Sequence, residues 1–175
     1  MNNESLQYPI GKFAASESYT AQEMDRCIER IATLPARIEA VVKDFSQKHF
    51  DLPYREGGWS ARQVLHHVSD SHMNAYIRFK WALTEDTPLI KAYDEKRWAE
   101  TPEVKLDPIL SLNLLKALHV KWVALLRSLS PEDLQRGYIH PETKKHVKLA
   151  TIVAMYAWHG DHHLGHLKIV AEKSN

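Results

Sequence analysis

The chain of 175 residues and 20.2 kDa contains 44% apolar and 26% charged residues, which predicts one folded domain over residues 1–175 and excludes a disordered chain. Its 23 basic and 22 acidic residues give a net charge of +1, and the sequence has no basic tract. No apolar run approaches the ~20 residues that a membrane span needs. Cys27 is the single cysteine, so no internal disulfide can form. We therefore expect a soluble cytoplasmic protein, without a basic and apolar leader segment, that binds neither nucleic acid nor a membrane.

The first half of the chain predicts an arm and two long helices. The first twenty residues are expected to lie against the domain as an irregular arm. From Thr20 to about Ser46, apolar residues recur at three- and four-residue steps, which predicts a helix that Pro35 kinks or divides. Residues 51–58 are predicted to be a loop that ends in two glycines. Ser60-Ala-Arg-Gln63 has the pattern of a capping box, and it begins a second helix that ends near Thr84.

The second half predicts two further helices and a small β element. Residues 86–106 form a long polar connection, and Asp107-Pro108 begins a third helix that ends near Leu129. A short helical turn follows at 130–133, and residues 140–143 form a turn between two short extended pieces. A last helix spans residues 149–173. Four long helices with almost no β pattern predict an all-α fold, a four-helix bundle with long irregular connections.

Histidines are concentrated in two short segments that are almost a hundred residues apart. Seven of the eleven lie there: His66, His67, His72, His159, His162, His163 and His166. His159 and His163 are one helical turn apart on an apolar stripe, so both imidazoles are expected to point inward. The alternative is two core histidines with hydrogen-bond partners. Burying several imidazoles is costly because each brings a donor and an acceptor, and this favours a metal site completed by a third ligand.

The earlier segment offers three candidates for that third ligand. His72 lies in the middle of the apolar stripe of its helix and is expected to be a structural core residue. His66 projects to one side, and His67 lies at the polar edge of the stripe, which suits a pocket lining. Asp161 is expected to face solvent. Three imidazoles leave coordination positions open, as catalytic metal sites do, and they suit Zn, Ni, Cu and Fe, of which Zn is our first choice.

Several motifs together carry a family resemblance. The longest reads Tyr54-Arg-Glu-Gly-Gly-Trp-Ser-Ala-Arg-Gln-Val-Leu-His-His-Val-Ser-Asp-Ser-His-Met-Asn74. Others occur at residues 8–11, 76–80, 93–98, 140–143 and 158–163. Taken from the N-terminus to the C-terminus, these motifs resemble those of the YfiT-like members of the DinB superfamily, and they cover nearly the whole chain.

This resemblance implies a DinB-type four-helix bundle that forms a homodimer and holds one divalent metal per chain. The family's first metal ligand precedes x-x-Asp, which matches His67 and Asp70. Its other two ligands form a His-x-x-x-His pair, which matches His159 and His163. Members of this group are commonly named metal-dependent hydrolases, and some related proteins are thiol transferases that use bacillithiol or another low-molecular-weight thiol.

The first hypothesis for the chemistry is metal-dependent hydrolysis of a small molecule. The metal lowers the pKa of a bound water from ~15.7 towards ~7, which generates hydroxide at neutral pH. Asp70, Glu56 and Asp94 are the candidate general bases. Asp70 has an alternative role, which is to orient a ligand imidazole.

The second hypothesis is thiol transfer. The open coordination position stabilises a thiolate, which attacks an electrophile such as an epoxide and needs no protein base. Arg55, Arg62 and Arg78 are candidates to hold the carboxylates of the thiol or the substrate. Aromatic candidates for the pocket wall are Trp59, Tyr93 and Trp98.

A third hypothesis is a non-catalytic, metal-binding stress protein. Its coordination sphere would be closed by a further protein ligand, such as His162 or His166. We place hydrolysis first because it requires only water as a co-substrate.

Overall fold

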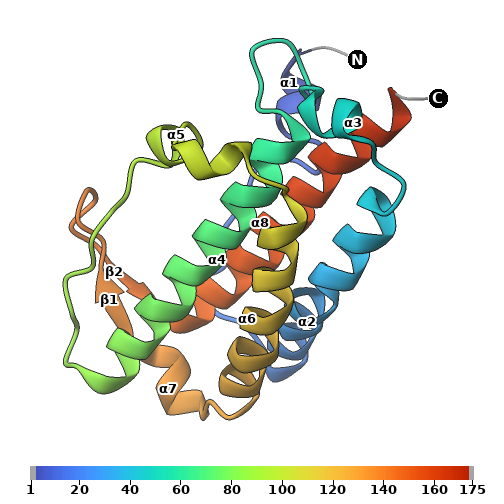
Figure 1. Cartoon of the computed structure of the whole chain (residues 1–175). Coiled ribbons are helices and arrows are strands. Elements are labelled where there is room, and N and C mark those ends of the chain that lie inside the picture. Colours follow the sequence, from blue (N-terminus) through green and yellow to red (C-terminus); the bar gives the residue numbers. More distant parts are fainter. Residues whose placement is uncertain (1–2, 174–175) are drawn as a thin grey trace.

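The fold is a four-helix bundle, described over residues 3–173 by a computed structural model (Figure 1). The bundle helices are α2 (Ala21–Val42), α4 (Ala61–Thr84), α6 (Ile109–Arg127) and α8 (Leu149–Glu172). Helix α8 packs against α2 and α4, and α6 packs against the same two helices. The contacts therefore close a ring in the order α2, α8, α4, α6, with α2 and α4 at opposite corners.

Local sequence signals account for the starts of two bundle helices. The Thr20 side chain accepts a hydrogen bond from the Glu23 amide, and the Glu23 side chain bonds back to the amide of Thr20. Ser60 and Gln63 make the same reciprocal pair at the start of α4, as the sequence predicts. Each capping box satisfies amide groups that the first helical turn leaves without a partner.

Helix α2 continues through Pro35 and is not divided there. The apolar residues on either side of the proline, Leu34 and Ile38, are both buried in one core cluster. Packing of this face against α6 and α8 stabilises the helix despite the amide hydrogen bond that a proline cannot make.

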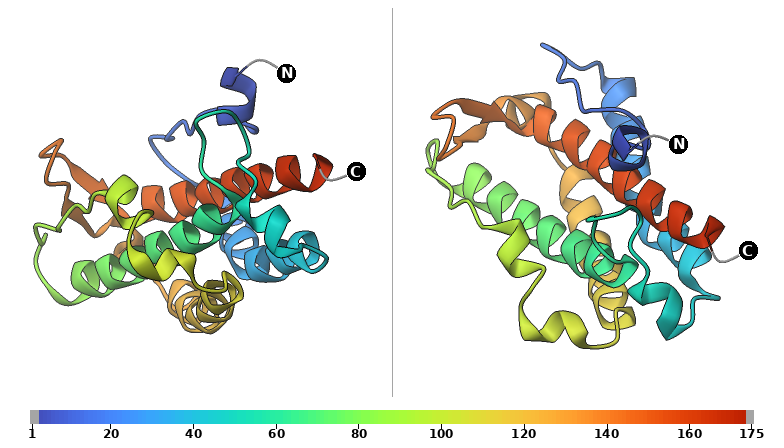
Figure 2. Two further views of the ribbon diagram at one scale, coloured as in Figure 1. Left: turned by 45° about the horizontal axis from the view of Figure 1, so that its top comes forward. Right: turned by 90° about the horizontal axis from the view of Figure 1, so that it is seen from above.

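The connections contain short elements that the sequence pattern did not predict as helices. They are α1 (Asn3–Gln7), α3 (Gln47–Asp51), α5 (Glu95–Trp98) and the 3₁₀ helix η1 (Pro102–Lys105). Helix α7 (Pro131–Gln135) and the antiparallel strands β1 (Gly137–Ile139) and β2 (His146–Lys148) match the predicted turn of helix and extended pieces. The N-terminal arm packs along α8, as expected, and α1 is part of it (Figure 2).

Two apolar clusters fill the bundle. The first contains Met24, Ile31, Phe79, Trp122 and Ile152 among others, and the second contains Leu34, Ile38, Val64, Leu115 and Leu167 among others. Along α4, α6 and α8 respectively, the buried His72, His119 and His163 lie between the residues of one cluster and those of the other. The bundle thus holds a layer of imidazoles between two apolar layers.

Helix α6 is the only helix in residues 3–173 whose length and composition suffice to cross a membrane. Here it packs against α2 and α4 and buries Leu112, Leu115 and Trp122 in the bundle.

The prediction that Asp161 faces solvent is wrong. Its carboxylate lies 2.7 Å from Arg30 Nε and 2.7 Å from Arg37 Nη1, and both arginines belong to α2. Helix α2 covers this side of α8, so the face of α8 opposite the histidine pair is also an internal contact of the bundle.

Candidate metal centre

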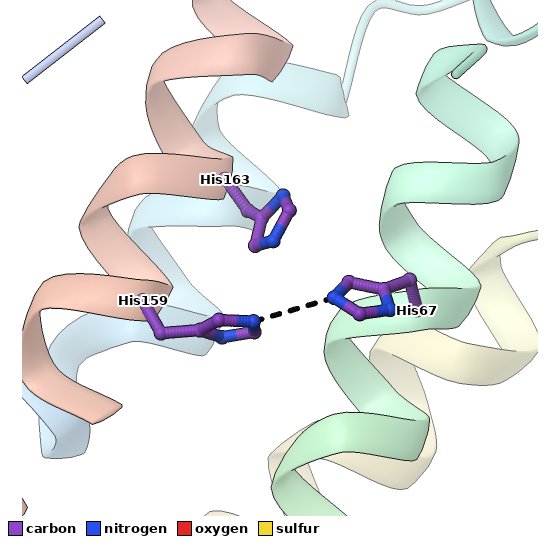
Figure 3. Close-up of side chains that lie close together, drawn as sticks. All are labelled: His67, His159 and His163. Atoms are coloured by element: carbon purple, nitrogen blue, oxygen red, sulfur yellow. Dashed lines mark hydrogen bonds between the residues drawn. The ribbon is translucent and has the colours of Figure 1, made fainter. Parts of the chain in front are cut away.

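Three imidazoles from α4 and α8 converge in the histidine layer. The Nε2 atoms of His67 and His159 are 3.3 Å apart, and the His163 ring lies beside both (Figure 3). Ring centroids are 4.8 Å apart for His67 and His163, and 4.5 Å apart for His159 and His163. One ring nitrogen from each residue lies within 4.8 Å of the other two.

Burial keeps these imidazoles neutral at physiological pH. It lowers the pKa of His67 from 6.5 to about 4, with a smaller effect from the nearby His162. Burial also holds the pKa values of His159 and His163 well below 6.5, and the neighbouring imidazoles add to the effect. Neutral imidazole is the form that binds metals, so little proton release accompanies metal binding at neutral pH.

The geometry and the donor types fit a divalent metal. Zn–N bonds of about 2.0–2.1 Å at a tetrahedral angle place two ligand nitrogens about 3.3–3.4 Å apart. The separation of His67 Nε2 and His159 Nε2 is 3.3 Å. Among the described residues, the group contains imidazoles only and no carboxylate. Such a nitrogen donor set suits Zn, Ni, Cu and Fe.

A second histidine group overlaps the first. His162, His163 and His166 also bring one ring nitrogen each within 4.8 Å, and they share His163 with the first group. His162 stacks on Trp158 with ring centroids 4.7 Å apart, and His166 stacks on Tyr54 at 3.8 Å. Neither His162 nor His166 is a member of the first group.

Two more histidines extend the layer behind His159. His72 is completely buried, and its Nε2 lies 3.2 Å from His159 Nδ1. It is a core residue, as predicted, but it also contacts a candidate ligand. His119 of α6 lies 2.9 Å from His72 Nδ1. The local sequence pattern does not distinguish His119 as a site residue. It falls on the buried stripe of α6: Leu112, Leu115, His119, Trp122 and Leu126.

A cavity of about 710 Å³ opens directly onto His67, His159 and His163. Its walls come from the N-terminal arm, from the loop before α4, and from α5. Trp59 lies in this wall, as predicted, with its ring centroid 4.7 Å from that of His67. Tyr93 lines a different cavity, and Trp98 packs against Tyr93 at 4.6 Å.

The three candidate arginines lie in different places. Arg55 lines the cavity of the histidine group. Arg62 lies outside it, because its guanidinium bonds to Asp51 at 2.9 Å and to the Leu106 carbonyl at 2.8 Å. Arg78 lines the separate cavity of about 590 Å³ and donates to the Lys91 carbonyl at 3.0 Å.

The candidate general bases also differ from expectation. Asp70 follows His67 by one helical turn, but it does not line the cavity. Burial, and then the charge of Glu103, raise the pKa of Asp70 to about 6. Glu56 is not part of the wall either, and Asp94 lines the separate cavity. The carboxylates in the wall belong to Glu95 and Glu100, which lie on a connection whose course the sequence pattern does not determine.

The fold and the histidine group define a helical-bundle protein with a candidate metal centre on α4 and α8. The chain belongs to the DinB superfamily, whose model matches residues 17–167. A Bacillus mycoides (strain KBAB4) protein named "Putative metal-dependent hydrolase" is 48% identical over 98% of this chain and 99% of its own length. A Bacillus cereus (strain 03BB102) protein with the same name is 49% identical over 97% of this chain and 98% of its own length.

The fold also matches a solved structure. YfiT from Bacillus subtilis, described as "a probable metal-dependent hydrolase with an unusual four-helix bundle topology", is 43% identical to this chain. The two structures superpose with a TM-score of 0.94 over 97% of this chain and 98% of YfiT. The four-helix bundle predicted from the sequence is therefore confirmed, and so is the resemblance to the YfiT-like proteins.

Proposed function

We propose that this protein is a metal-dependent hydrolase of small molecules, with one divalent metal per chain held by His67, His159 and His163. The observation that carries the proposal is the 3.3 Å separation of two neutral imidazole nitrogens beside an open cavity. The names of the relatives support the same activity. Zn is our first choice of metal, and Ni or another divalent metal is the alternative.

Each part of the site has a distinct task in this proposal. A divalent metal supplies a Lewis acid that activates water at neutral pH. The three imidazoles hold it and leave at least one position for water or substrate. Trp59 packs against His67 and limits the movement of its ring. Glu95 and Glu100 are the carboxylates of the wall and the candidates for proton transfer.

The cavity supports a small-molecule substrate. Its volume of about 710 Å³ lies in the range of ligand pockets, about 300–1,000 Å³. Arg55 and Lys96 place positive charge in the wall, and Tyr8 and Tyr54 provide aromatic surface. We therefore expect substrates that combine an apolar or aromatic part with a polar, hydrolysable group.

The test is hydrolysis of a panel of esters and amides by the metal-loaded protein, the metal-free protein and the His159→Ala variant. We expect turnover by the metal-loaded protein only, restored in the metal-free protein when Zn²⁺ is added back. Equal turnover by all three samples would contradict a metal-dependent hydrolase.

Thiol transfer is the second candidate, and one observation favours it. Among the described residues, no carboxylate belongs to the histidine group: Glu95 and Glu100 lie elsewhere in the cavity wall, and Asp70 lies outside the cavity. A thiolate that attacks an epoxide needs no protein base, because the opened alkoxide takes up the proton that the thiol released. Metal-dependent conjugation of an epoxide with a low-molecular-weight thiol, without ester or amide turnover, would select this activity. Metal binding without either activity would favour a non-catalytic metal-binding protein.

A further inference from the structure

A backbone carbonyl of α2 determines the tautomer of a histidine on α6. The Nδ1 atom of His119 lies 2.7 Å from the carbonyl oxygen of Ile31. A carbonyl oxygen can only accept a hydrogen bond, so His119 must carry its proton on Nδ1. Its Nε2 atom then bears a lone pair and can only accept.

This constraint passes to His72 and then to His159. His72 Nδ1 lies 2.9 Å from His119 Nε2, so it must be the donor, which leaves His72 Nε2 as an acceptor. His159 Nδ1 lies 3.2 Å from His72 Nε2 and must therefore donate in turn. The lone pair of His159 is left on Nε2, the atom that lies 3.3 Å from His67 Nε2.

The chain of donors holds because each ring carries a single proton. The His72 ring is enclosed by uncharged or basic rings, those of His119, Trp122, Tyr156 and His159. Both side chains are buried, with exposed fractions of 2% for His119 and 0% for His72, so a second ring proton would be a buried charge without an anionic partner. A neutral imidazole has one donor and one acceptor, so fixing the role of one nitrogen fixes the role of the other.

We infer that His72 and His119 are positioning residues that hold His159 in the Nδ1–H tautomer and direct its Nε2 lone pair into the metal site. The inference rests on the proposed metal site, and it adds a role for two residues that touch no ligand of that site other than His159. The opposite tautomer would place an N–H bond where a metal must bind. Hydrogen bonds from a ligand's second nitrogen are a general means of fixing its tautomer and orientation.

A shorter chain of the same kind reaches His163. His166 Nε2 lies 3.2 Å from the carbonyl oxygen of Gln7, so it donates to this carbonyl. His166 Nδ1 is then the acceptor for His163 Nδ1, 3.3 Å away. This leaves the lone pair of His163 on Nε2. Both α8 ligands thus depend on a carbonyl of another element, Ile31 of α2 or Gln7 of α1.

The longer series of hydrogen bonds, from Ile31 to His159, joins all four bundle helices. Ile31 lies on α2, His119 on α6, His72 on α4 and His159 on α8. A shift of any of these helices would lengthen a hydrogen bond between buried polar groups and leave one of them without a partner, which is unfavourable. Correct assembly of the bundle is therefore coupled to the tautomer of His159.

The direct test is long-range ¹H–¹⁵N correlation NMR on the metal-free protein with ¹⁵N-labelled histidines at pH 7.5. We expect His119, His72 and His159 all to carry their proton on Nδ1. An Nε2–H form of His72 or His159 would overturn the inference. This measurement uses the unaltered protein and decides the inference whether or not a variant folds.

A Zn²⁺ titration against a competing chelator tests the consequence for binding. His119→Phe fills a similar volume without an acceptor, and we expect Zn²⁺ affinity to fall at least about tenfold. His119→Gln offers both a donor and an acceptor and should restore part of the loss. His66→Phe is the matched control. His66 is a buried α4 histidine whose hydrogen-bond partner is Ser111 at 2.8 Å, so it is not part of the hydrogen-bond series from Ile31 to His159.

The possible outcomes separate the inference from the proposed site. Unchanged Zn²⁺ affinity in His119→Phe, with tight binding by the unaltered protein, would overturn the inference alone. Failure of the unaltered protein to bind Zn²⁺ would contradict the proposed site, whereas the tautomers measured by NMR would still support or overturn the assignment of donors.

Discussion

The Nε2 atoms of His67 and His159 lie 3.3 Å apart although the two residues are 92 positions apart in the sequence. Their approach depends on the packing of α4 against α8, which two apolar clusters on either side of the histidine layer stabilise. At this distance one of the two nitrogens can donate a hydrogen bond to the other. A divalent metal bound by both lone pairs would take the place of that proton, and 3.3 Å matches the spacing of two nitrogens around a tetrahedral Zn²⁺.

Alanine substitutions test the ligand assignment. Because three imidazoles share the metal, His67→Ala, His159→Ala and His163→Ala are each expected to weaken Zn²⁺ affinity by more than about 100-fold, beyond the usual effect of losing an outer hydrogen-bond partner. The measurement is chelator-competition titration of the metal-free proteins.

Two neighbouring histidines provide the controls for those substitutions. His66→Ala and His162→Ala should retain Zn²⁺ affinity, because neither residue is in the group formed by His67, His159 and His163. Loss of binding in His162→Ala would instead favour the overlapping group of His162, His163 and His166. Equal retention by all the variants would contradict the assignment.

The stability of the metal-free protein should depend on pH in a defined direction. Burial lowers the pKa values of His67 and His119 from 6.5 to about 4, so the unfolded chain binds protons at a higher pH than the folded protein. The contribution of these two histidines to the free energy of unfolding is therefore fully present above about pH 6.5 and is lost as pH falls towards 4. Each pKa shift corresponds to a loss of about 3 kcal/mol of unfolding free energy. Urea unfolding between pH 7.5 and 4.5 measures this loss, and a constant free energy of unfolding would contradict it.

Asp70→Asn should raise stability at neutral pH. Burial and the charge of Glu103 raise the pKa of Asp70 to about 6, so its carboxylate is charged at pH 7.5 in a position that favours the neutral form. The gain is roughly 1 kcal/mol after allowance for partial exposure. It falls as pH drops below about 6 and disappears below about pH 3, where Asp70 is protonated in both states. Urea unfolding at pH 7.5 and at pH 3 measures it. Weaker Zn²⁺ binding by this variant would instead favour the hypothesis that Asp70 orients a ligand.

Gly160 allows the close approach of α8 to α2. A Cβ atom at this position would lie 2.5 Å from Leu34 Cδ2, and Leu34 is buried. Gly160→Val is therefore expected to cost about 2 kcal/mol of unfolding free energy through overpacking. Thermal or urea unfolding measures the change. Ala117→Val, on an exposed part of α6, is the control and should have an effect of at most about 0.5 kcal/mol.

The long helices could be predicted because periodicity and capping agree. The Ser60 capping box and the apolar stripe of α4 indicate the same helix, and the structure confirms its start and end. The short helices α1, α3 and α5 have four or five residues each, so tertiary contacts rather than a periodic pattern determine them. A helical wheel predicts a solvent-facing Asp161 because it shows which residues share a face and not which helix covers that face; here α2 covers it.

The site was predicted only in part for the same reason. The His159–His163 spacing shows that the two imidazoles share a face, and the choice of His67 over His66 came from the x-x-Asp motif. The roles of His72 and His119 depend on contacts 87 and 88 residues apart, between His72 and His159 and between His119 and Ile31. Nothing in the local pattern distinguishes such histidines from hydrogen-bonded core residues. Similarly, the sequence does not show that Arg55 lines the cavity and Arg62 does not, because this depends on the path of the loop before α4.

The most direct test of the central claim is anomalous diffraction from a crystal of the protein grown with Zn²⁺. The account predicts one peak about 2.0–2.1 Å from a ring nitrogen of each of His67, His159 and His163, with at least one further position filled by water or another small ligand. A peak held by His162 and His166 instead, a site closed by a fourth protein ligand, or no peak within the bundle would contradict it.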